Sequence, residues 1–233
     1  MIISCFPVTI PPVATGNYDF IVDWGDDQQD IITTYNDAAI THTYDSAGEY
    51  VVEIIGTFTG WQFNDGGDKL KLLNIENWGR FKTNGEDGVF YGSANLEITA
   101  RDILNLSGVT NLKGFFRNCS SITTIPNINL WDISSITSVR EMFRGCTLFN
   151  SAFPDWDFSS ITGLGYVDFL NSAAAFNQVL SHLDFTNATN INGLLNDASS
   201  FDRNSDVEGW NVTPIQFFYR IFRNTGLDRD WET

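Results

Sequence analysis

Residues 1–68 contain no lysine or arginine, although they contain eleven aspartate and glutamate side chains. Over all 233 residues, 13 basic side chains stand against 29 acidic ones, so the formal net charge is −16 and the sequence pI is about 4.2. A nucleic-acid backbone and an anionic membrane surface both repel a chain of this charge. We therefore expect no nucleic-acid partner, which leaves cationic and neutral partners open.

Cysteine and histidine are scarce as well. The three cysteines, Cys5, Cys119 and Cys146, cannot all be paired within one chain, and none has a second cysteine or a histidine close enough for a zinc site. The two histidines, His42 and His182, belong to no G-x-S-x-G, H-E-x-x-H, phosphate-loop or dinucleotide motif. We expect no metal, no cofactor, no catalytic residues and no enzymatic activity. His42 is expected to be structural, and His182 to have a surface or packing role. The sequence assigns no ligand-binding residue.

Long hydrophobic runs are also missing. No run approaches the roughly 18 to 20 apolar residues of a transmembrane helix, so we expect no membrane insertion. The first six residues resemble a bacterial lipobox ending at Cys5, but no basic and no apolar segment precedes them, as a signal peptide would require. Apolar material is nevertheless plentiful, with 42% hydrophobic and 14% aromatic residues. The composition therefore predicts a folded globular protein.

Charge composition divides the chain into two units. Residues 69–233 contain all 13 basic side chains together with 18 acidic ones. The acidic first unit contains short β-forming runs separated by turn residues, at positions 2–10, 18–24, 30–35, 41–44 and 49–58. Short strands at this spacing are typical of a β-sandwich. We predict a first domain at residues 1–60 and a second at residues 61–233.

Three segments of the first unit resemble the PKD-type immunoglobulin-like domain. They are Tyr-Asp-Phe-Ile-Val-Asp-Trp-Gly-Asp at 18–26, His-Thr-Tyr at 42–44 and Ala-Gly-Glu-Tyr-Val-Val at 47–52. The resemblance covers about residues 1–60 and implies an all-β sandwich. The family's usual W-G-D-G is W-G-D-D here, so Asp27 stands where a turn glycine is expected. Aspartate tolerates left-handed backbone angles better than most residues, which makes this a mild departure.

The resemblance also implies roles for individual side chains. Trp24 is expected to fill the core at a strand end, and Asp26 to accept backbone N–H bonds in the following turn. Tyr44 and Tyr50 are expected to brace the opposite sheet. The nearby carboxylates of Asp23, Asp26, Asp27 and Asp30 could alternatively bind calcium. The turn motif already explains Asp23 and Asp26, and neighbouring strand residues point to different faces, so we expect no metal there.

The second unit contains an internal repeat with a period of roughly 25 to 27 positions. Trp-Asp-Ile-Ser-Ser-Ile-Thr at 131–137 returns with changes in the other units, which begin near residues 78, 104, 131, 156, 183 and 210. A second apolar column keeps step with the first and comprises Phe90, Phe116, Phe143, Phe169, Leu195 and Phe222. Equivalent side chains of a repeat stack on one another, so we expect both columns in the core.

Cys119 and Cys146 fall at equivalent small-residue positions of adjacent units. A disulfide between them is an alternative, but the same position also accepts serine, alanine and threonine. We therefore expect two buried, reduced thiols.

Each repeat is interpreted as a short strand followed by a helical or 3₁₀ turn. The stretch before each tryptophan, such as residues 122–128, looks extended, and Ser134 and its equivalents could cap a short helix. The predicted fold is an N-terminal all-β immunoglobulin-like sandwich plus a leucine-rich-repeat-like α/β solenoid of about six coils. No Pro-rich or Ser-rich linker separates the units, so we expect the sandwich to seat directly on the first coil.

The repeat resembles that of BspA-like surface proteins over about residues 75–228. The segments 131–150 and 156–177 carry the resemblance through the pattern Trp-Asp-x-Ser-Ser-Ile-Thr, a following apolar pair and a final Phe-Asn. Leu183 in place of tryptophan, and Pro214, depart from this pattern. The resemblance implies a secreted, cell-surface or phage-borne recognition or structural protein without a catalytic residue set.

Asp155 and Asp157 flank Trp156, and paired carboxylates are the catalytic groups of glycosidases. Asp157, however, occupies the repeat position of Asp132 and Asp184, which favours a structural role in a turn. We do not expect catalysis there.

The sequence thus favours a non-enzymatic virion protein, such as a phage fibre, tail or capsid decoration, that presents its repeats to a host receptor or glycan. The alternatives are a bacterial cell-surface adhesin fragment and a structural subunit that stacks into fibres. Other virion or surface proteins are the expected partners, so we expect the chain to be part of an assembly. We also expect Trp231 and the residues up to Thr233 to be too few to cover the last coil.

Overall fold

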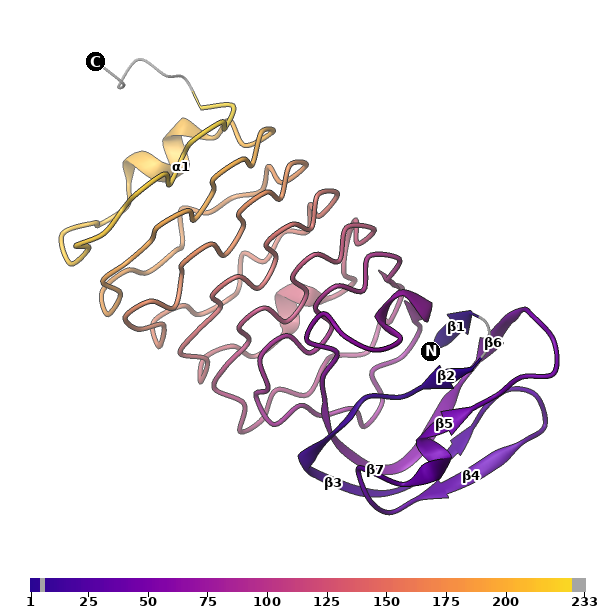
Figure 1. Cartoon of the computed structure of the whole chain (residues 1–233). Helices are drawn as coiled ribbons and strands as arrows, with labels where there is room; N and C mark the ends of the chain where they lie inside the picture. Colours follow the sequence, from indigo (N-terminus) through magenta and orange to yellow (C-terminus); the bar gives the residue numbers. More distant parts are fainter. Residues whose placement is uncertain (5–6, 228–233) are drawn as a thin grey trace.

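The computed structural model describes residues 1–4 and 7–227 and forms an elongated molecule, with strands at one end and repeated turns along the rest (Figure 1). The strands are β1 (Ile2–Ser4), β2 (Val8–Thr9), β3 (Pro12–Asp23), β4 (Gln29–Ile32), β5 (Thr41–His42), β6 (Glu49–Val51), β7 (Glu53–Trp61), β8 (Leu72–Ile75) and β9 (Glu97–Ile98). The helical segments are the 3₁₀ helices η1 (Ala38–Ile40), η2 (Lys69–Lys71) and η3 (Ile128–Leu130) and the α-helix α1 (Asn204–Glu208).

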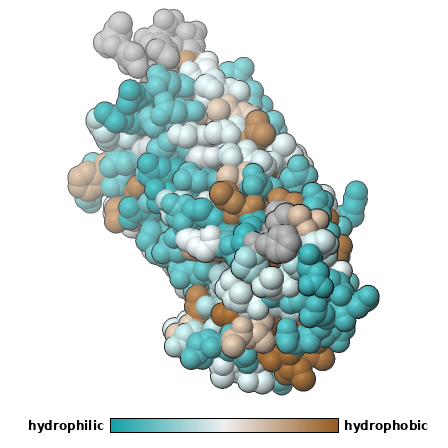
Figure 2. All heavy atoms as spheres, turned by 45° about the vertical axis from the view of Figure 1, so that its right-hand side comes forward, coloured by the Kyte–Doolittle hydropathy of each residue, from teal (hydrophilic) through white to brown (hydrophobic). Residues whose placement is uncertain are grey.

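The longest strand, β3, lies between β4 and β7 in an antiparallel three-stranded sheet. Its side chains alternate, so Tyr18, Phe20 and Val22 are buried. The outward-facing row Ile31, Ile21 and Ile55 crosses all three strands and stays exposed. Figure 2 shows apolar patches at this end of a mostly hydrophilic surface.

A second sheet connects the N-terminal strands to the repeats. Its order is β6-β1-β8-β9, with β1 antiparallel to both neighbours and β8 parallel to β9. Strands β8 and β9 lie beyond residue 60, so this sheet crosses the predicted boundary between the two domains. The aromatic rings of Trp61 and Phe81 also meet there, at 6.2 Å between centroids. The N-terminal strands therefore pack directly on the first repeat. The two-stranded sheet β2-β5 completes the strand pairing of the described residues.

From residue 85 onward, backbone hydrogen bonds join neighbouring repeats in both directions. Amides elsewhere in the repeat, such as those of Thr137 and Asn150, donate to carbonyls of the preceding repeat, whereas one segment of each repeat donates to the next repeat. In one repeat the amides of Val139, Glu141, Phe143 and Gly145 donate to carbonyls of the next repeat, those of Gly165, Val167, Phe169 and Asn171. The carbonyls just before these amides accept from the preceding repeat, at Leu112, Gly114, Phe116 and Asn118. In this segment of each repeat, alternate peptide groups therefore lie along the stack, with their N–H groups directed toward the C-terminal end.

Positive φ angles at two positions per repeat make this arrangement possible. The affected residues are Gly88, Gly114, Glu141, Asp168, Gly193 and Arg220 in one column and Gly92, Asn118, Gly145, Ser172, Asp197 and Asn224 in the other. A residue with positive φ reverses the orientation of the chain and cannot continue a right-handed helix. The intervening bonds are turns, such as Met142 N–H to the Val139 carbonyl at 3.0 Å.

The core contains the predicted columns, with one shift in register and with Phe222 of the last repeat only partly buried. Trp131, Trp156, Phe116 and Phe143 are all at most 3% exposed, and the rings of Phe116 and Phe143 stack at 5.8 Å. In the fourth unit, Leu170 rather than Phe169 stands in register, because the Leu170 amide donates onward as the Phe143 amide does. Phe169 is buried beside it.

The predicted fold class, an immunoglobulin-like sandwich plus an α/β solenoid, is wrong. The residues that the structure describes form three small sheets and are only 6% helical, and their repeats beyond β9 contain no named strand. Residues 134–143, expected to form a capped helix, form turns instead. The reason is that their amides donate to a neighbouring repeat or close short turns, which leaves no ladder of helical i to i−4 bonds. Across the described residues, no helix has the length and apolar character needed to span a bilayer.

Candidate functional site

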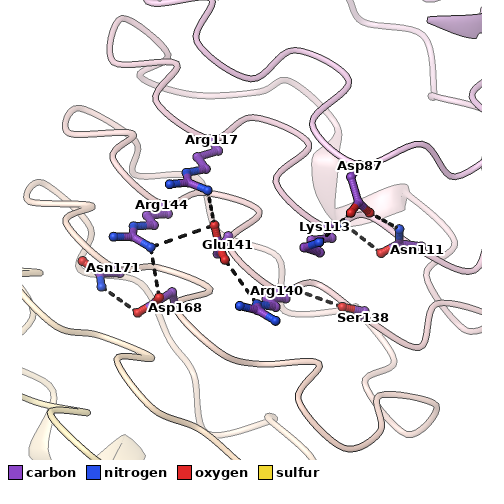
Figure 3. A network of polar contacts seen from close by, with 10 residues as sticks. All are labelled: Asp87, Asn111, Lys113, Arg117, Ser138, Arg140, Glu141, Arg144, Asp168 and Asn171. Atoms are coloured by element: carbon purple, nitrogen blue, oxygen red, sulfur yellow. Dashed lines mark hydrogen bonds and ion pairs between the residues drawn. The ribbon is translucent and has the colours of Figure 1, made fainter. Parts of the chain in front are cut away.

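Charged side chains from four adjacent repeats gather on one face of the stack (Figure 3). Lys113 and Arg140 are separated by one repeat, as are Arg117 and Arg144, so each pair lies at equivalent positions of neighbouring repeats. The hydrogen-bonded register between repeats holds these positions side by side. Four of the chain's 13 basic residues are thereby concentrated on this face.

Glu141 lies at the centre of the network. Its side chain is only 8% exposed and its backbone has φ 57°, at the register that glycine occupies in other repeats. Arg117 forms an ion pair with it, Arg140 Nε lies 3.2 Å from Oε1, and Arg144 Nη1 lies 3.9 Å from Oε2. Three guanidinium groups thus surround one buried carboxylate, which compensates the cost of its burial.

Two carboxylates extend the network to the neighbouring repeats. Arg144 Nη1 lies 3.1 Å from Asp168 Oδ2. The other carboxylate oxygen, Asp168 Oδ1, accepts a hydrogen bond from Asn171 Nδ2 at 2.7 Å. At the opposite side, Asp87 pairs with Lys113 at 2.5 Å and accepts from Asn111 Nδ2 at 2.7 Å. Partial burial acts to raise the pKa of Asp87. The hydrogen bonds from these two partners and the positive charges of Lys113 and Arg140 together outweigh it and hold that pKa below its ordinary value.

The three arginines keep part of their surface in solvent. Their side chains are 30% exposed at Arg117, 37% at Arg140 and 38% at Arg144. Their three positive charges exceed the two negative charges of Glu141 and Asp168 by one, although the net charge of the whole chain is −16. Planar guanidinium groups suit two-point hydrogen bonding to carboxylate or sulfate groups. This face, which we call the arginine face (Arg117, Arg140, Glu141, Arg144), can therefore hold an anionic group.

Sequence reasoning did not identify the arginine face. The available signal was the return of a basic residue one repeat later, from Lys113 to Arg140 and from Arg117 to Arg144. The convergence of the arginines on Glu141 depends on which peptide groups are hydrogen-bonded, and the sequence does not show this.

The residues predicted around Trp24 do come together, in a structural cluster. Trp24 is fully buried, its Nε1 donates to Asp30 Oδ2 at 2.8 Å, and its indole stacks on His42 at 4.8 Å. His42 Nε2 lies 2.8 Å from Asp26 Oδ2, and the Tyr44 hydroxyl donates to the Trp24 carbonyl at 2.9 Å. The predicted core role of Trp24 and structural role of His42 are confirmed.

The carboxylates of the turn after β3 are engaged separately. Asp23 accepts from the Gly25 amide and the Gln29 side chain, and these bonds lower its pKa. Asp26 accepts from the Gln28 amide at 3.3 Å, and Asp27 has the positive φ of 66° expected of a residue in place of glycine. Among the described residues, no group of three or more His, Cys, Asp or Glu side chains has the geometry to hold a metal ion.

Cys119 and Cys146 are fully buried free thiols, as expected. Their Sγ atoms point back at the preceding repeat, to the Phe90 carbonyl at 3.1 Å and the Phe116 carbonyl at 2.9 Å. Burial raises the pKa of Cys146 to about 12, so it stays protonated. The expectations placed on Cys5 and Trp231 lie outside the described residues.

Asp157 has the structural role expected from the repeat. Its Oδ1 accepts from the Ser159 amide at 2.9 Å, and the same turn recurs in the pairs Asn105–Ser107, Asp132–Ser134, Asp184–Thr186 and Asn211–Thr213. The hydrogen bonds from Ser159 lower the pKa of Asp157. His182 packs against the ring of Phe158 at 5.6 Å, and its partial burial lowers its pKa.

A family model described as "Mycoplasma protein of unknown function, DUF285" matches residues 61–167 and 166–230. The matched segments begin at the last residue of β7 and cover the repeats. No curated protein and no solved structure matches the chain.

Proposed function

Because the chain belongs to the DUF285 family, which has no assigned function, we propose a function from its own residues: non-enzymatic recognition of a receptor or glycan at a virion or cell surface. The resemblance of the repeats to BspA-like surface proteins supports this proposal. The PKD-like segments of residues 1–60 support a docking role for the N-terminal strands.

The observation that carries the proposal is the arginine face. Three guanidinium groups supplied by two adjacent repeats are held in place by one buried carboxylate, while about a third of each remains in solvent. Side chains held in advance lose little conformational entropy when a ligand binds. An oligosaccharide bearing a carboxylate or sulfate group is therefore the ligand class that this face suits best.

The test uses the full chain on immobilised sialylated, sulfated and neutral oligosaccharides. We expect binding to an acidic oligosaccharide and weaker binding to its neutral counterpart. Arg140→Gln removes a rim guanidinium and leaves Arg117 and Arg144 to neutralise Glu141, so affinity should fall on the order of tenfold, or about 1.4 kcal/mol. Arg101→Gln is the matched control, because Arg101 is exposed and lies outside the network.

Two results would contradict the proposal. One is the absence of binding to every oligosaccharide together with no binding to intact host cells. The other is equal binding by Arg140→Gln, Arg101→Gln and the unaltered chain, which would exclude the arginine face. Immunoelectron microscopy of cells and virions from the source separates the two surface locations, since labelled virions favour the phage component and labelled cell envelopes favour the adhesin.

A further inference from the structure

A cavity of about 260 Å³ lies where the N-terminal strands meet the first repeat. Strand β7 and the chain just before it form one wall, and the segment from Leu72 to Phe81 forms the other. Its volume is just below the roughly 300 to 1,000 Å³ of typical ligand pockets. Asn77, Gly79 and Arg80 line it and are exposed, so the cavity communicates with solvent. It is distant in sequence from the arginine face and shares no residue with it.

Two tryptophans with unsatisfied N–H groups line this cavity. Trp61 and Trp78 are each 3% exposed, and neither indole Nε1 has a hydrogen-bond acceptor among the described residues. Both indoles contact the rings of Phe81 and Phe90, at centroid distances of 6.1 to 6.2 Å, so the same two rings join the indoles of the two walls. A buried donor without an acceptor is unfavourable, and a bound acceptor would remove that cost.

The missing acceptors are not a general property of tryptophan in this fold. Trp156 Nε1 donates to the Ile128 carbonyl at 2.7 Å, and Trp210 Nε1 donates to the Leu180 carbonyl at 2.9 Å. Trp131 also lacks an acceptor among the described residues but does not line the cavity. Trp131 therefore separates an effect of the cavity from an effect of an unpaired indole.

The remaining lining defines the chemistry of the ligand. Phe58, Leu72 and Ile75 add apolar side chains to those of Phe81 and Phe90. The charged groups of the lining are the carboxylates of Glu53 and Glu76, the Arg80 guanidinium and the amino group of Met1, so positive and negative charges balance. Apolar walls without an excess charge of either sign favour an uncharged ligand over an ion.

We propose that this cavity binds a small uncharged molecule with an apolar body and one hydrogen-bond acceptor, which the indole N–H of Trp61 or Trp78 recognises. The acceptor fixes the ligand's orientation, and the aromatic walls bury its body. This activity is independent of the recognition function proposed for the arginine face.

Acetophenone and α-methylstyrene provide a matched pair of probes, because they have nearly the same shape and only acetophenone has a strong acceptor. The full chain, labelled with ¹⁵N, is titrated with each while the indole Hε1 resonances are followed by NMR. We expect acetophenone to shift the Trp61 or Trp78 resonance saturably and downfield, and to bind on the order of tenfold more tightly than α-methylstyrene. Trp131 packs edge-on against Trp78 at 5.7 Å but lies outside the cavity, so its resonance should shift much less.

A cavity-filling variant provides an independent test. Ile54 is half-buried and lines the cavity, so Ile54→Phe should abolish the acetophenone shift. Ile31→Phe is the control, because Ile31 is 68% exposed on the outer face of β4 and should leave binding unchanged.

Each outcome decides the proposal. No saturable shift with acetophenone at millimolar concentration overturns it, as do equal shifts at Trp131 or unchanged binding in a folded Ile54→Phe variant. Equal affinity for the two probes overturns the role of the indole donors. If Ile54→Phe fails to fold, the comparison of the two probes on the unaltered chain remains decisive.

Discussion

At the scale of single residues, the chain places its few reactive side chains in structural positions. His42 is held between Trp24 and Tyr44 and bonded to Asp26. The thiols of Cys119 and Cys146 donate to backbone carbonyls inside the core. Each of these side chains is fixed by partners on neighbouring elements, which is why its stability contribution can be tested by a single substitution.

Replacing Trp24 with alanine should destabilise the protein by about 3 to 5 kcal/mol, because a fully buried aromatic side chain is removed and a cavity remains. The denaturant midpoint and slope measure this change. Tyr35→Ala is the control, since Tyr35 is 44% exposed in the same part of the chain. A loss below about 1 kcal/mol for Trp24→Ala would show that Trp24 is not part of the core.

The buried thiols should not react with iodoacetamide in the folded protein and should react fully in denaturant. Burial raises the pKa of Cys146 from 9.0 to about 12, so its contribution to stability is complete below pH 9 and is lost as the pH rises toward 12. Cys146→Ala, which places alanine where Ala198 stands in a later repeat, should lessen this alkaline loss of stability. Mass spectrometry that finds a native Cys119–Cys146 bridge would contradict the prediction.

At the scale of the repeat, the segment that contains the two positive-φ residues donates to the next repeat, so its hydrogen bonds distinguish one end of the stack from the other. The first repeat's carbonyls at Gly88, Val89 and Tyr91 accept from the amides of residues 63–65. At the far end, the amides of Phe218, Arg220 and Asn224 occupy positions whose equivalents in earlier repeats donate to the next repeat. None of these three amides donates to another residue of the described chain. This end therefore offers donors and exposes Phe217, Phe218 and Tyr219.

Amide hydrogen exchange should reveal this difference between neighbouring repeats. We expect strong protection at Ile191, Gly193 and Leu195, whose amides donate to the last repeat, and rapid exchange at Phe218 and Arg220. NMR exchange measurements on the full chain resolve these positions individually. Equal protection in the two groups would mean that another segment or a second molecule supplies acceptors at this end.

The same end allows a paired test of burial. Phe218 is 55% exposed, whereas Ile191, at the same register one repeat earlier, is fully buried. Phe218→Asp should therefore change the unfolding free energy by less than about 1 kcal/mol, while Ile191→Asp should cost several kcal/mol, because it buries an unpaired charge. Thermal denaturation compares the two. Similar losses for both variants would show that Phe218 is covered in solution.

At the scale of the whole molecule, strand β1 unites the N-terminal strands and the repeats. It pairs with β6 on one side and β8 on the other, through Ile3 opposite Tyr50 and Leu72. Trp61 continues the same core between the rings of Phe58 and Phe90. The two parts share a sheet and a core, and we expect them to unfold together.

Leu72→Ala tests this coupling. Leu72 is 2% exposed in β8, so its truncation should cost about 2 to 5 kcal/mol. Because β8 pairs with β1, amides of both the N-terminal strands and the first repeat should lose protection in the same variant. Loss of protection confined to the repeats would show that the two parts unfold independently.

The sequence alone determined the repeat period, the two core columns, the buried free thiols, the recurring Asp turns and the core position of Trp24. These properties follow from residue type and spacing, because a repeat brings equivalent side chains together whatever its backbone conformation. The tertiary structure decided the rest. Peptide groups one repeat apart satisfy each other's hydrogen bonds, so turns with positive φ replace the predicted strands and helices, and Leu170 replaces Phe169 in register. The same long-range pairing gathers the arginines around Glu141 and brings Trp61 to Trp78. Sequence patterns describe local preferences, whereas these contacts depend on which distant backbone groups meet.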